Sequence, residues 1–285
     1  MTTAQQIYWH TTVQMPNSSS LTLLPENVDV VIIGGGFTGL SAARTLAKQG
    51  VRAAVLEANT IGWGASSRNG GMVLTGLKLG MQTVMKKYGR ELARRLFQCS
   101  LDSIDTVEQI VNEENIDCGF ARYGHLLMAN KPKHYSALQE EVEFMEREFN
   151  HRVRLIPRSK QRTELGSEIY HGALLDERSG GLNPAQYVAG LAAAAERAGA
   201  TLHARARVTG LERRSPGRFY IETERGSLSA ESVLVGTSGY TGRVTKKLQK
   251  RVIPIGSFII ATEKLSPELV KELIPNKRMI FDYKH

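Results

Sequence analysis

The chain of 285 residues is 41% hydrophobic and 23% charged, a balance typical of a folded globular protein and untypical of a disordered or membrane-spanning one. Its 37 Lys and Arg residues outnumber its 28 Asp and Glu residues, but the basic pairs are dispersed among acidic residues without interleaved aromatic ones, so nucleic-acid binding is not expected. We also expect no membrane span and a cytoplasmic location, because the sequence has neither a long apolar run nor a secretory signal at its start.

The spacing of cysteine and histidine argues against a metal centre. Cys99 and Cys118 are the only cysteines, and neither belongs to a C-x-x-C motif. No pair among the seven histidines has the H-x-H or H-x-x-x-H spacing of metal ligands. We therefore expect neither a protein-bound metal nor a dithiol redox centre.

The first regular elements expected along the chain form a βαβ unit. Residues 1–27, which include the polar run 17–20, are expected to be an irregular arm. The apolar pattern then predicts a strand over 29–33, a helix over 37–49 and a strand over 51–56. An opening of this kind is typical of proteins with a parallel sheet.

A G-x-G-x-x-G motif lies where the first strand turns into the helix. Gly34 permits the tight turn, Gly36 lets the backbone approach a pyrophosphate, and Gly39 lets the helix and strand lie close together. The free N–H groups and partial positive charge of the helix N-terminus favour phosphate at this point. In its strand–turn–helix context the motif predicts nucleotide binding, with a purely structural glycine turn as the alternative.

An acidic residue follows the second strand. Glu57 stands where a carboxylate would accept hydrogen bonds from the ribose hydroxyls of an adenosine. Its negative charge would repel a 2′-phosphate, which disfavours NADP and leaves FAD or NAD. The alternative is an ordinary surface glutamate.

The segment from Gly62 to Gly71 combines small residues, hydroxyls, a guanidinium and an amide within ten positions. A plain NAD-binding domain would proceed from its second strand to a crossover helix. A loop of this composition can instead run along a long ligand and donate hydrogen bonds to it, which favours FAD. By itself, the segment is equally consistent with a flexible linker.

The later elements alternate between helices and strands. They are helices over 81–89 and 91–115, a strand over 124–129, a helix over 133–149, a strand over 152–156, a loop-rich segment over 158–182, a helix over 185–198 that follows Pro184, and strands over 201–213, 218–224 and 227–236. This order predicts an α/β fold in which a Rossmann-like nucleotide domain is interrupted by an α+β domain.

Several segments, taken together and in order, resemble one protein family. They are DVVIIGGGFTGLSAARTLAKQG, VLEA, IGWGASSRNGG, RYGHLLMAN, GALLDERSGGLNPAQYVAGLAAAAERAGA and AESVLVGTSGYTG. The set resembles the FAD-dependent amine and amino-acid oxidoreductases of the D-amino-acid oxidase and glycine oxidase class. Within that class it looks most like the gamma-glutamylputrescine oxidases, and the resemblance covers about residues 25–285.

The resemblance implies FAD as the cofactor and assigns its contacts to particular positions. Val208 matches a position whose backbone meets the adenine, and Leu182 to Pro184 resemble the start of the helix that returns to the cofactor domain. The cofactor-binding residues that the resemblance implies are Gly34, Gly36, Phe37, Thr38, Gly39, Glu57, Ala65, Ser66, Arg68, Asn69, Gly70, Gly71, Val208, Thr237, Ser238 and Gly239.

The resemblance also implies a division into domains. After the arm 1–27, an FAD-binding domain would comprise residues 28–80 and 181–245, and a substrate domain would comprise residues 81–180 and 246–285.

The implied reaction is oxidation of the C–N bond of an amine or amino acid. FAD accepts a hydride at its N5 atom, an imine forms, and oxygen or another acceptor reoxidises the flavin. A gamma-glutamylputrescine-like amine is the favoured substrate. His125 and Tyr240 are candidate substrate contacts, with Tyr123 a similar case, although a single strand histidine is more often structural. No catalytic residue is identified.

The family pattern continues beyond FDYKH with further substrate-domain strands and a glycine-rich segment. The sequence is therefore expected to be an N-terminal portion, in which sheet edges within 252–261 would have no neighbours. Two alternatives to an active amine oxidoreductase remain open, a non-catalytic nucleotide-binding remnant and an NAD-dependent dehydrogenase.

Overall fold

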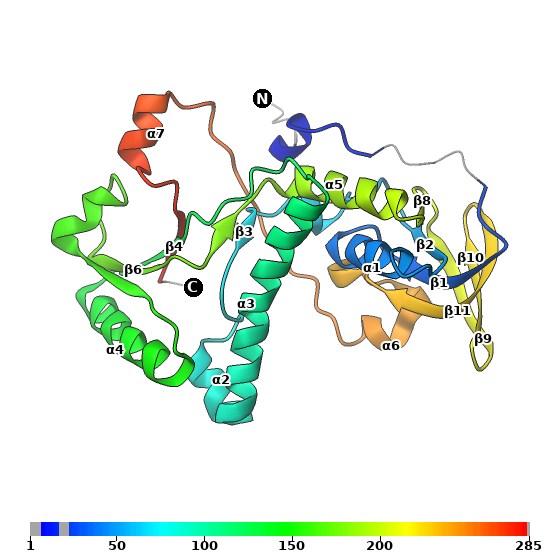
Figure 1. Ribbon diagram of the computed structural model, residues 1–285, viewed down its shortest axis with the longest axis horizontal. Helices are drawn as coiled ribbons and strands as arrows, with labels where there is room; N and C mark the ends of the chain where they lie inside the picture. Colours follow the sequence, from blue (N-terminus) through cyan, green and yellow to red (C-terminus); the bar gives the residue numbers. More distant parts are fainter. Residues whose placement is uncertain (1–6, 17–22, 284–285) are drawn as a thin grey trace. The chain divides into compact units, whose positions relative to one another are not determined.

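The computed structural model describes residues 7–16 and 23–283, so the run 17–20 lies outside the described residues. The chain divides into two compact units, and each is described by itself (Figure 1). Unit 1 comprises Met1–Gly70, Asn112–Cys118 and Asn183–Ile260, and unit 2 comprises Gly71–Val111, Gly119–Leu182 and Ala261–His285. These bounds differ from those of the expected FAD-binding and substrate domains, since the chain first changes unit after Gly70 and last after Ile260.

Unit 1 contains a six-stranded sheet with the order β8-β2-β1-β11-β10-β9. The first four strands in this order are parallel, and β11, β10 and β9 form an antiparallel meander. In the register, Val30 lies opposite Ala53 on one side and Ser232 on the other. The strands are β1 (Asn27–Ile33), β2 (Ala53–Leu56), β8 (Thr201–His203), β9 (Val208–Ser215), β10 (Arg218–Thr223) and β11 (Gly226–Val235).

One expected strand of unit 1 is wrong as predicted. The segment 201–213 is two strands, β8 and β9, which lie at opposite ends of the sheet order. Arg205 interrupts the segment with a φ of 51°, a left-handed conformation that ends an extended strand. Because the interruption contains no glycine or proline, no local pattern marks it.

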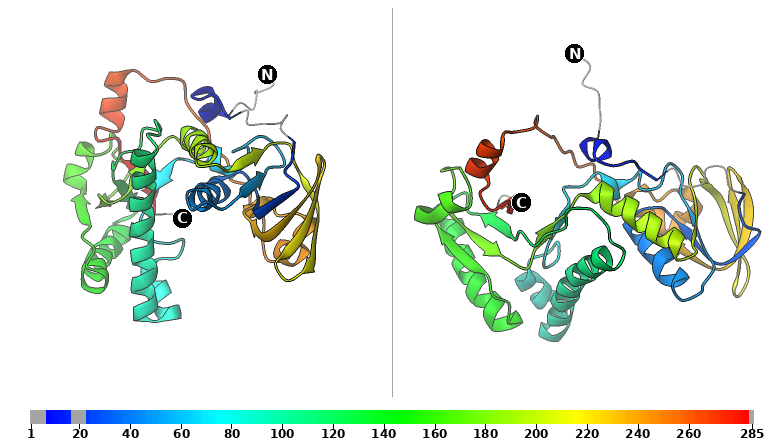
Figure 2. Two further views of the ribbon diagram at one scale, coloured as in Figure 1. Left: turned by 45° about the vertical axis from the view of Figure 1, so that its right-hand side comes forward. Right: turned by 45° about the horizontal axis from the view of Figure 1, so that its top comes forward.

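Two helices of unit 1, α1 (Phe37–Ala47) and α5 (Pro184–Arg197), contact each other, as Figure 2 shows in both views. Leu40 of α1 and Leu191 of α5 are both buried. The Asn183 side chain caps α5 by accepting hydrogen bonds from the N–H groups of Ala185 and Gln186, and Pro184 occupies the first helical turn. Shorter elements of the unit are η1 (Tyr8–Thr11), η2 (Ala65–Ser67), η4 (Ser238–Tyr240), η5 (Arg243–Thr245) and α6 (Lys246–Gln249).

Unit 2 contains a four-stranded sheet with the order β12-β4-β6-β5 and a small pair, β3-β7. The strand β12 is parallel to β4, and the other neighbours are antiparallel. The strands are β3 (Met72–Val73), β4 (His125–Met128), β5 (Arg154–Pro157), β6 (Gly172–Asp176), β7 (Gly180–Gly181) and β12 (Met279–Asp282).

The expected loop-rich segment 158–182 is a second correction. It contains β6, which lies between β4 and β5 and is buried along its whole length. A strand that is buried on both faces lacks the alternation of apolar and polar residues by which short strands are recognised. The segment also contains β7 and the short helix η3 (Arg158–Thr163).

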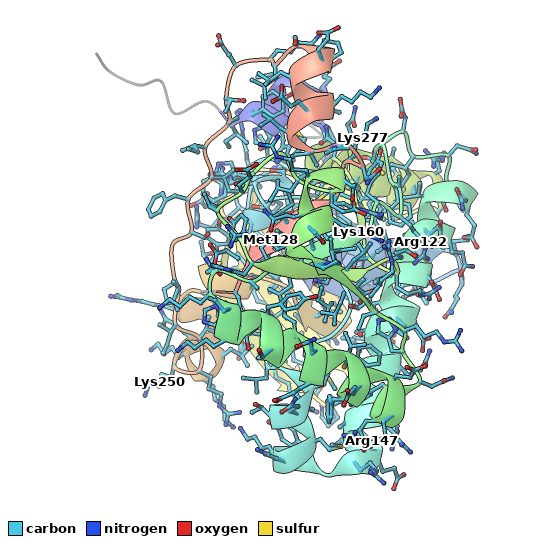
Figure 3. The ribbon with its side chains drawn as sticks, turned by 90° about the vertical axis from the view of Figure 1, so that its left-hand side faces the viewer. Arg122, Met128, Arg147, Lys160, Lys250 and Lys277 are labelled. Carbon is cyan, nitrogen blue, oxygen red and sulfur yellow. The ribbon has the colours of Figure 1, made fainter. Side chains whose placement is uncertain are left out.

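The helices of unit 2 cover its sheet and each other. Phe97 and Phe144 share a core with Met81, and Leu138 on α4 is buried against Leu174 of β6. Arg147 lies at the C-terminal end of α4, where its side chain points away from the core (Figure 3). The helices are α2 (Met81–Tyr88), α3 (Arg90–Glu113), α4 (Pro132–Phe149) and α7 (Pro267–Leu273).

The expected sheet edges within 252–261 are a third correction, because this segment forms no strand. Ile253 and Phe258 are 84% and 94% exposed. Pro254 lacks an N–H donor and Gly256 adds backbone freedom, so both weaken a strand there. No helix in the described part of the chain is both long and apolar enough to cross a membrane.

Candidate cofactor-binding site

A cavity of about 970 Å³ lies in unit 1 at the carboxyl ends of β1, β2 and β11. Its size suits a ligand larger than a single amino acid. Several residues predicted from the sequence line it, namely Gly34, Gly36, Phe37, Thr38, Glu57, Ala65, Ser66, Val208, Thr237, Ser238 and Tyr240.

The turn between β1 and α1 requires glycine because three chain segments meet there. Gly34 has a φ of +112°, and a Cβ at this position would lie 2.7 Å from the Gly236 carbonyl oxygen. A Cβ at Gly39 would lie 1.9 Å from the Gly34 carbonyl oxygen. Side chains are thus excluded from the turn, and its backbone is exposed to the cavity.

The N-terminus of α1 points its free N–H groups toward the same cavity. Gly36 is the N-cap residue and offers no side-chain acceptor, and the first turn contains no acidic residue. The Phe37 N–H donates to the Ser66 Oγ at 3.0 Å, which fastens the loop to the helix end. Because the first turn of α1 itself contains no acidic residue, the positive end of its dipole can hold an anionic group such as a pyrophosphate.

Glu57 is held at the wall of the cavity by two backbone donors. Its Oε2 accepts the Gly35 N–H at 2.8 Å, and its Oε1 accepts the Asn59 N–H at 2.9 Å. A carboxylate has about four acceptor positions, so two further hydrogen bonds are available to ribose hydroxyls.

Other residues predicted from the loop support the cavity without lining it. The Asn69 Nδ2 donates to the carbonyls of Ala65 and Ser66, which closes the short helix η2. The guanidinium of Arg68 lies 4.3 Å from the centre of the Trp63 ring, and its Nε donates to the Trp63 carbonyl.

Four predicted glycines also lie outside the lining. Gly39 packs beneath the turn, where it contacts Gly34. Gly70 and Gly239 are exposed and are part of unit 1. Gly71 begins unit 2, where its carbonyl accepts the Leu182 N–H at 2.9 Å.

The two candidate substrate residues belong to different units. His125 lies on β4 of unit 2, with its Nδ1 3.1 Å from the Ser179 Oγ and its ring edge-on to Phe281. Burial lowers the pKa of His125 below its ordinary value, so its imidazole is neutral at pH 7. Tyr240 lies in unit 1, where it lines the cavity beside Trp63.

The cavity includes residues that sequence reasoning missed. Trp63 lines the cavity and is 36% exposed. Arg207, Arg243 and Lys246 add positive charge to the lining. Arg243 and Lys246 lie well beyond the end of β11, in a segment without periodic pattern, so only their charge could have drawn attention to them.

These features fit FAD. The glycine turn and helix end match a pyrophosphate, Glu57 matches a ribose, and the basic residues balance the phosphate charge. No group of three or more His, Cys, Asp or Glu side chains with the geometry of metal ligands occurs within residues 7–16 and 23–283.

Comparison with known proteins confirms the family expected from the motifs. The family model described as "FAD dependent oxidoreductase", DAO, matches residues 29–285. Gamma-glutamylputrescine oxidoreductase of Escherichia coli strain K12 is 34% identical over 255 residues, which cover 89% of this chain and 59% of that protein. A probable oxidoreductase, OrdL, of Haemophilus influenzae is 31% identical and is covered to 60% of its length.

Solved structures agree with the α/β fold. Glycine oxidase from Geobacillus kaustophilus is similar with a TM-score of 0.64 and 25% identity, over 79% of this chain and 59% of that one. L-proline dehydrogenase from P. horikoshii has a TM-score of 0.65 at 20% identity, over 92% of this chain and 66% of that one, and shows the fold alone.

The chain spans about 60% of the length of the Escherichia coli and Haemophilus influenzae relatives. The family model nevertheless covers nine tenths of the chain, including the glycine turn, Glu57 and the loop that contains Ser66. The chain therefore belongs to the DAO family of FAD-dependent oxidoreductases.

Proposed function

We propose that this chain forms the FAD site of an enzyme that oxidises the C–N bond of an amine or amino acid. The observation that carries the proposal is the cavity of unit 1, where the glycine turn, the α1 N-terminus and the fixed Glu57 carboxylate meet. No acidic side chain in the first turn of α1 opposes a pyrophosphate.

The chain's own residues would bind and orient the cofactor. The N–H groups of the α1 N-terminus would hold the pyrophosphate, and Glu57 would accept hydrogen bonds from the adenosine ribose. Bound FAD would supply the redox chemistry, taking a hydride from the carbon that bears the amine and leaving an imine for water to hydrolyse, before oxygen or another acceptor takes up the electrons.

A gamma-glutamylputrescine-like amine is the substrate that we favour. The support is the name of the Escherichia coli relative, which shares 34% identity with this chain. Other relatives are named for glycine and dimethylglycine, so all of these names specify a small amine or amino acid. The fold by itself does not distinguish between such substrates.

The visible absorption spectrum of the purified 285-residue chain tests the cofactor assignment. We expect the two bands of an oxidised flavin, and release by heat should yield FAD in a ratio of about one per chain. A colourless, folded chain that also fails to bind added FAD would contradict the proposal. Binding of NAD in the absence of flavin would support a dehydrogenase instead.

Anaerobic addition of amines tests the reaction. Because the relatives are longer than this chain, this experiment is carried out on the longest natural form of the protein. Gamma-glutamylputrescine should bleach the flavin bands, whereas the matched primary alcohol should not. Tight FAD binding without bleaching by any amine, including glycine and sarcosine, would favour a non-catalytic nucleotide-binding role.

A further inference from the structure

The described part of the N-terminal arm, residues 7–16, is anchored at the start of α5. The Asn183 side chain, which caps α5, also donates from its Nδ2 to the Thr12 Oγ1 at 2.7 Å. Thr12 Oγ1 in turn donates to the Trp9 carbonyl at 2.7 Å. At Gly62 a Cβ would lie 2.9 Å from the Met15 Cε, so the arm also approaches the beginning of the cofactor loop.

Two side chains of the arm reach the loop at the C-terminal end of η2. The Trp9 Nε1–H donates to the Asn69 carbonyl at 2.9 Å. The His10 Nε2 lies 2.7 Å from the Oγ of Ser67, whose exposed fraction is 0%. Ser66, which directly precedes Ser67, lines the cavity.

The hydrogen bonds around Ser67 determine which of His10 and Ser67 is the donor. The Ser67 hydroxyl donates its one hydrogen bond to the Gly62 carbonyl, at 2.6 Å. Its oxygen must therefore accept a hydrogen bond from the His10 Nε2–H, because a serine hydroxyl has a single donor. His10 is thus a donor, and Gln is the residue whose Nε2 could replace it.

The chain of hydrogen bonds continues into the nucleotide turn. The Gly62 N–H donates to the Gly35 carbonyl at 2.9 Å. The Gly35 N–H in turn donates to the Glu57 Oε2 at 2.8 Å. One continuous series of donors and acceptors therefore joins the arm to the turn and to the carboxylate at the cavity wall.

We propose that the arm is a strap, in which His10 and Trp9 act as positioning residues that hold Ala65–Asn69 in the shape that binds the cofactor. The inference rests on the proposed function, because it assigns the strap to the FAD site. Neither side chain is among the residues that line the cavity, so both act through Ser66, Ser67 and Asn69. An undocked arm would leave the buried Ser67 oxygen without its donor, a cost that the loop can relieve only by moving.

The first readout is hydrogen exchange of the amides of residues 64–69 in the chain without added flavin. In His10→Ala we expect exchange about tenfold faster than in the wild type, as for one lost hydrogen bond to a buried group. His10→Gln restores the donor and should exchange within about twofold of the wild type. Trp9→Phe keeps an aromatic side chain but removes the indole N–H, and should exchange about fivefold faster.

The second readout is the dissociation constant of FAD, measured by quenching of flavin fluorescence. It should rise about tenfold in His10→Ala and recover in His10→Gln. Thr11→Ala is the matched control, because the Thr11 hydroxyl donates only within the arm, to the Tyr8 carbonyl. The melting temperatures of all variants report whether the fold is retained.

The outcomes separate the two proposals. If the wild-type chain binds no FAD, the proposed function fails, while the exchange comparison still tests the strap. Equal exchange in His10→Ala and the wild type would overturn the strap. So would equally fast exchange in His10→Gln and His10→Ala, because the ring rather than its donor would then hold the loop.

Discussion

The cavity of unit 1 and the surroundings of Asp176 in unit 2 differ in how their polar groups are hydrogen-bonded. At the cavity, residues of the turn after β1 and of the first turn of α1 line the wall, and that first helical turn contains no acidic residue. In unit 2, Asp176 is 3% exposed and accepts hydrogen bonds from Thr75 at 2.6 Å, His151 at 2.9 Å and the Arg178 N–H at 2.9 Å. The first arrangement leaves donors available to a ligand, and the second uses its groups among themselves.

This difference indicates that the cavity residues serve ligand binding, whereas the groups around Asp176 serve stability. Burial raises the pKa of Asp176, but the hydrogen bonds from His151 and Thr75 outweigh it and hold the pKa below its usual value. Removing one partner of a buried, hydrogen-bonded charge is costly, because the remaining groups are left without partners. Changes at the cavity should therefore alter FAD affinity, and changes at Asp176 should alter unfolding.

The largest effect is expected at Gly39, because a change there should alter both FAD affinity and the free energy of unfolding. In Gly39→Ala the new Cβ would lie 1.9 Å from the Gly34 carbonyl oxygen, so α1 must move away from β1. We expect a loss of about 4 kcal/mol in the free energy of unfolding and more than about a hundredfold loss in FAD affinity. Urea denaturation measures the free energy of unfolding, and flavin titration measures the FAD affinity.

Gly256→Ala is the matched control for that substitution. Gly256 is exposed in unit 1, and a Cβ placed there would have only an ordinary contact, 3.8 Å from the Phe258 ring. It should change the unfolding free energy by less than about 0.5 kcal/mol. A Gly39→Ala chain with unaltered stability and FAD affinity would show that helix and strand do not need this close approach.

Asp176→Ala should separate stability from binding. The substitution leaves His151, Thr75 and the Arg178 N–H without their acceptor, at a cost of about 3 kcal/mol in the free energy of unfolding. The FAD dissociation constant should stay within about twofold. The neighbouring Glu177→Ala, whose side chain is 66% exposed, should change the unfolding free energy by less than about 1 kcal/mol. Equal urea midpoints for the two variants would contradict this assignment.

Glu57→Gln should act in the opposite sense, on binding more than on stability. The substitution replaces one acceptor oxygen by an NH₂ group, which must face the N–H of Gly35 or Asn59. We expect the FAD dissociation constant to rise about tenfold, with a loss of about 1 kcal/mol in stability. The exposed Glu26→Gln is the control, and an unchanged dissociation constant in Glu57→Gln would remove the ribose role.

The comparison also shows which parts of the molecule could be predicted from sequence. The β1–α1–β2 unit and α5 were predicted nearly to their ends, since apolar periodicity, the glycine motif and the Asn183 cap all lie within the segments that they define. The strand β6 was missed, because a buried strand without alternation resembles a loop between turns. The α/β class followed from the order of the elements.

Most of the cavity could be predicted for the same reason, and the strap could not. Gly34, Gly36 and Glu57 belong to one local motif with a known geometry. The contact between His10 and Ser67 joins residues separated by 57 positions, with no pattern connecting them. All of the proposed FAD contacts stay predictions, including those of Arg68, Gly71 and Gly239, which lie outside the cavity lining.

The smallest expected effect is the pH dependence of the arm. Burial, and then the positive charge of Arg68, lowers the pKa of His10 below its ordinary value of 6.5. The undocked arm therefore takes up a proton more readily than the docked arm, so docking is complete above pH 6.5 and weakens as the pH falls through that value toward the lower docked pKa. Exchange of residues 64–69 in the wild type, divided by that in His10→Gln, should rise modestly between about pH 7.5 and about pH 5.5. Division by the variant removes the intrinsic pH dependence of exchange and every titration other than that of His10. A ratio that does not change with pH would mean that protonation of His10 leaves the arm docked, and the strap would then act at all pH values alike.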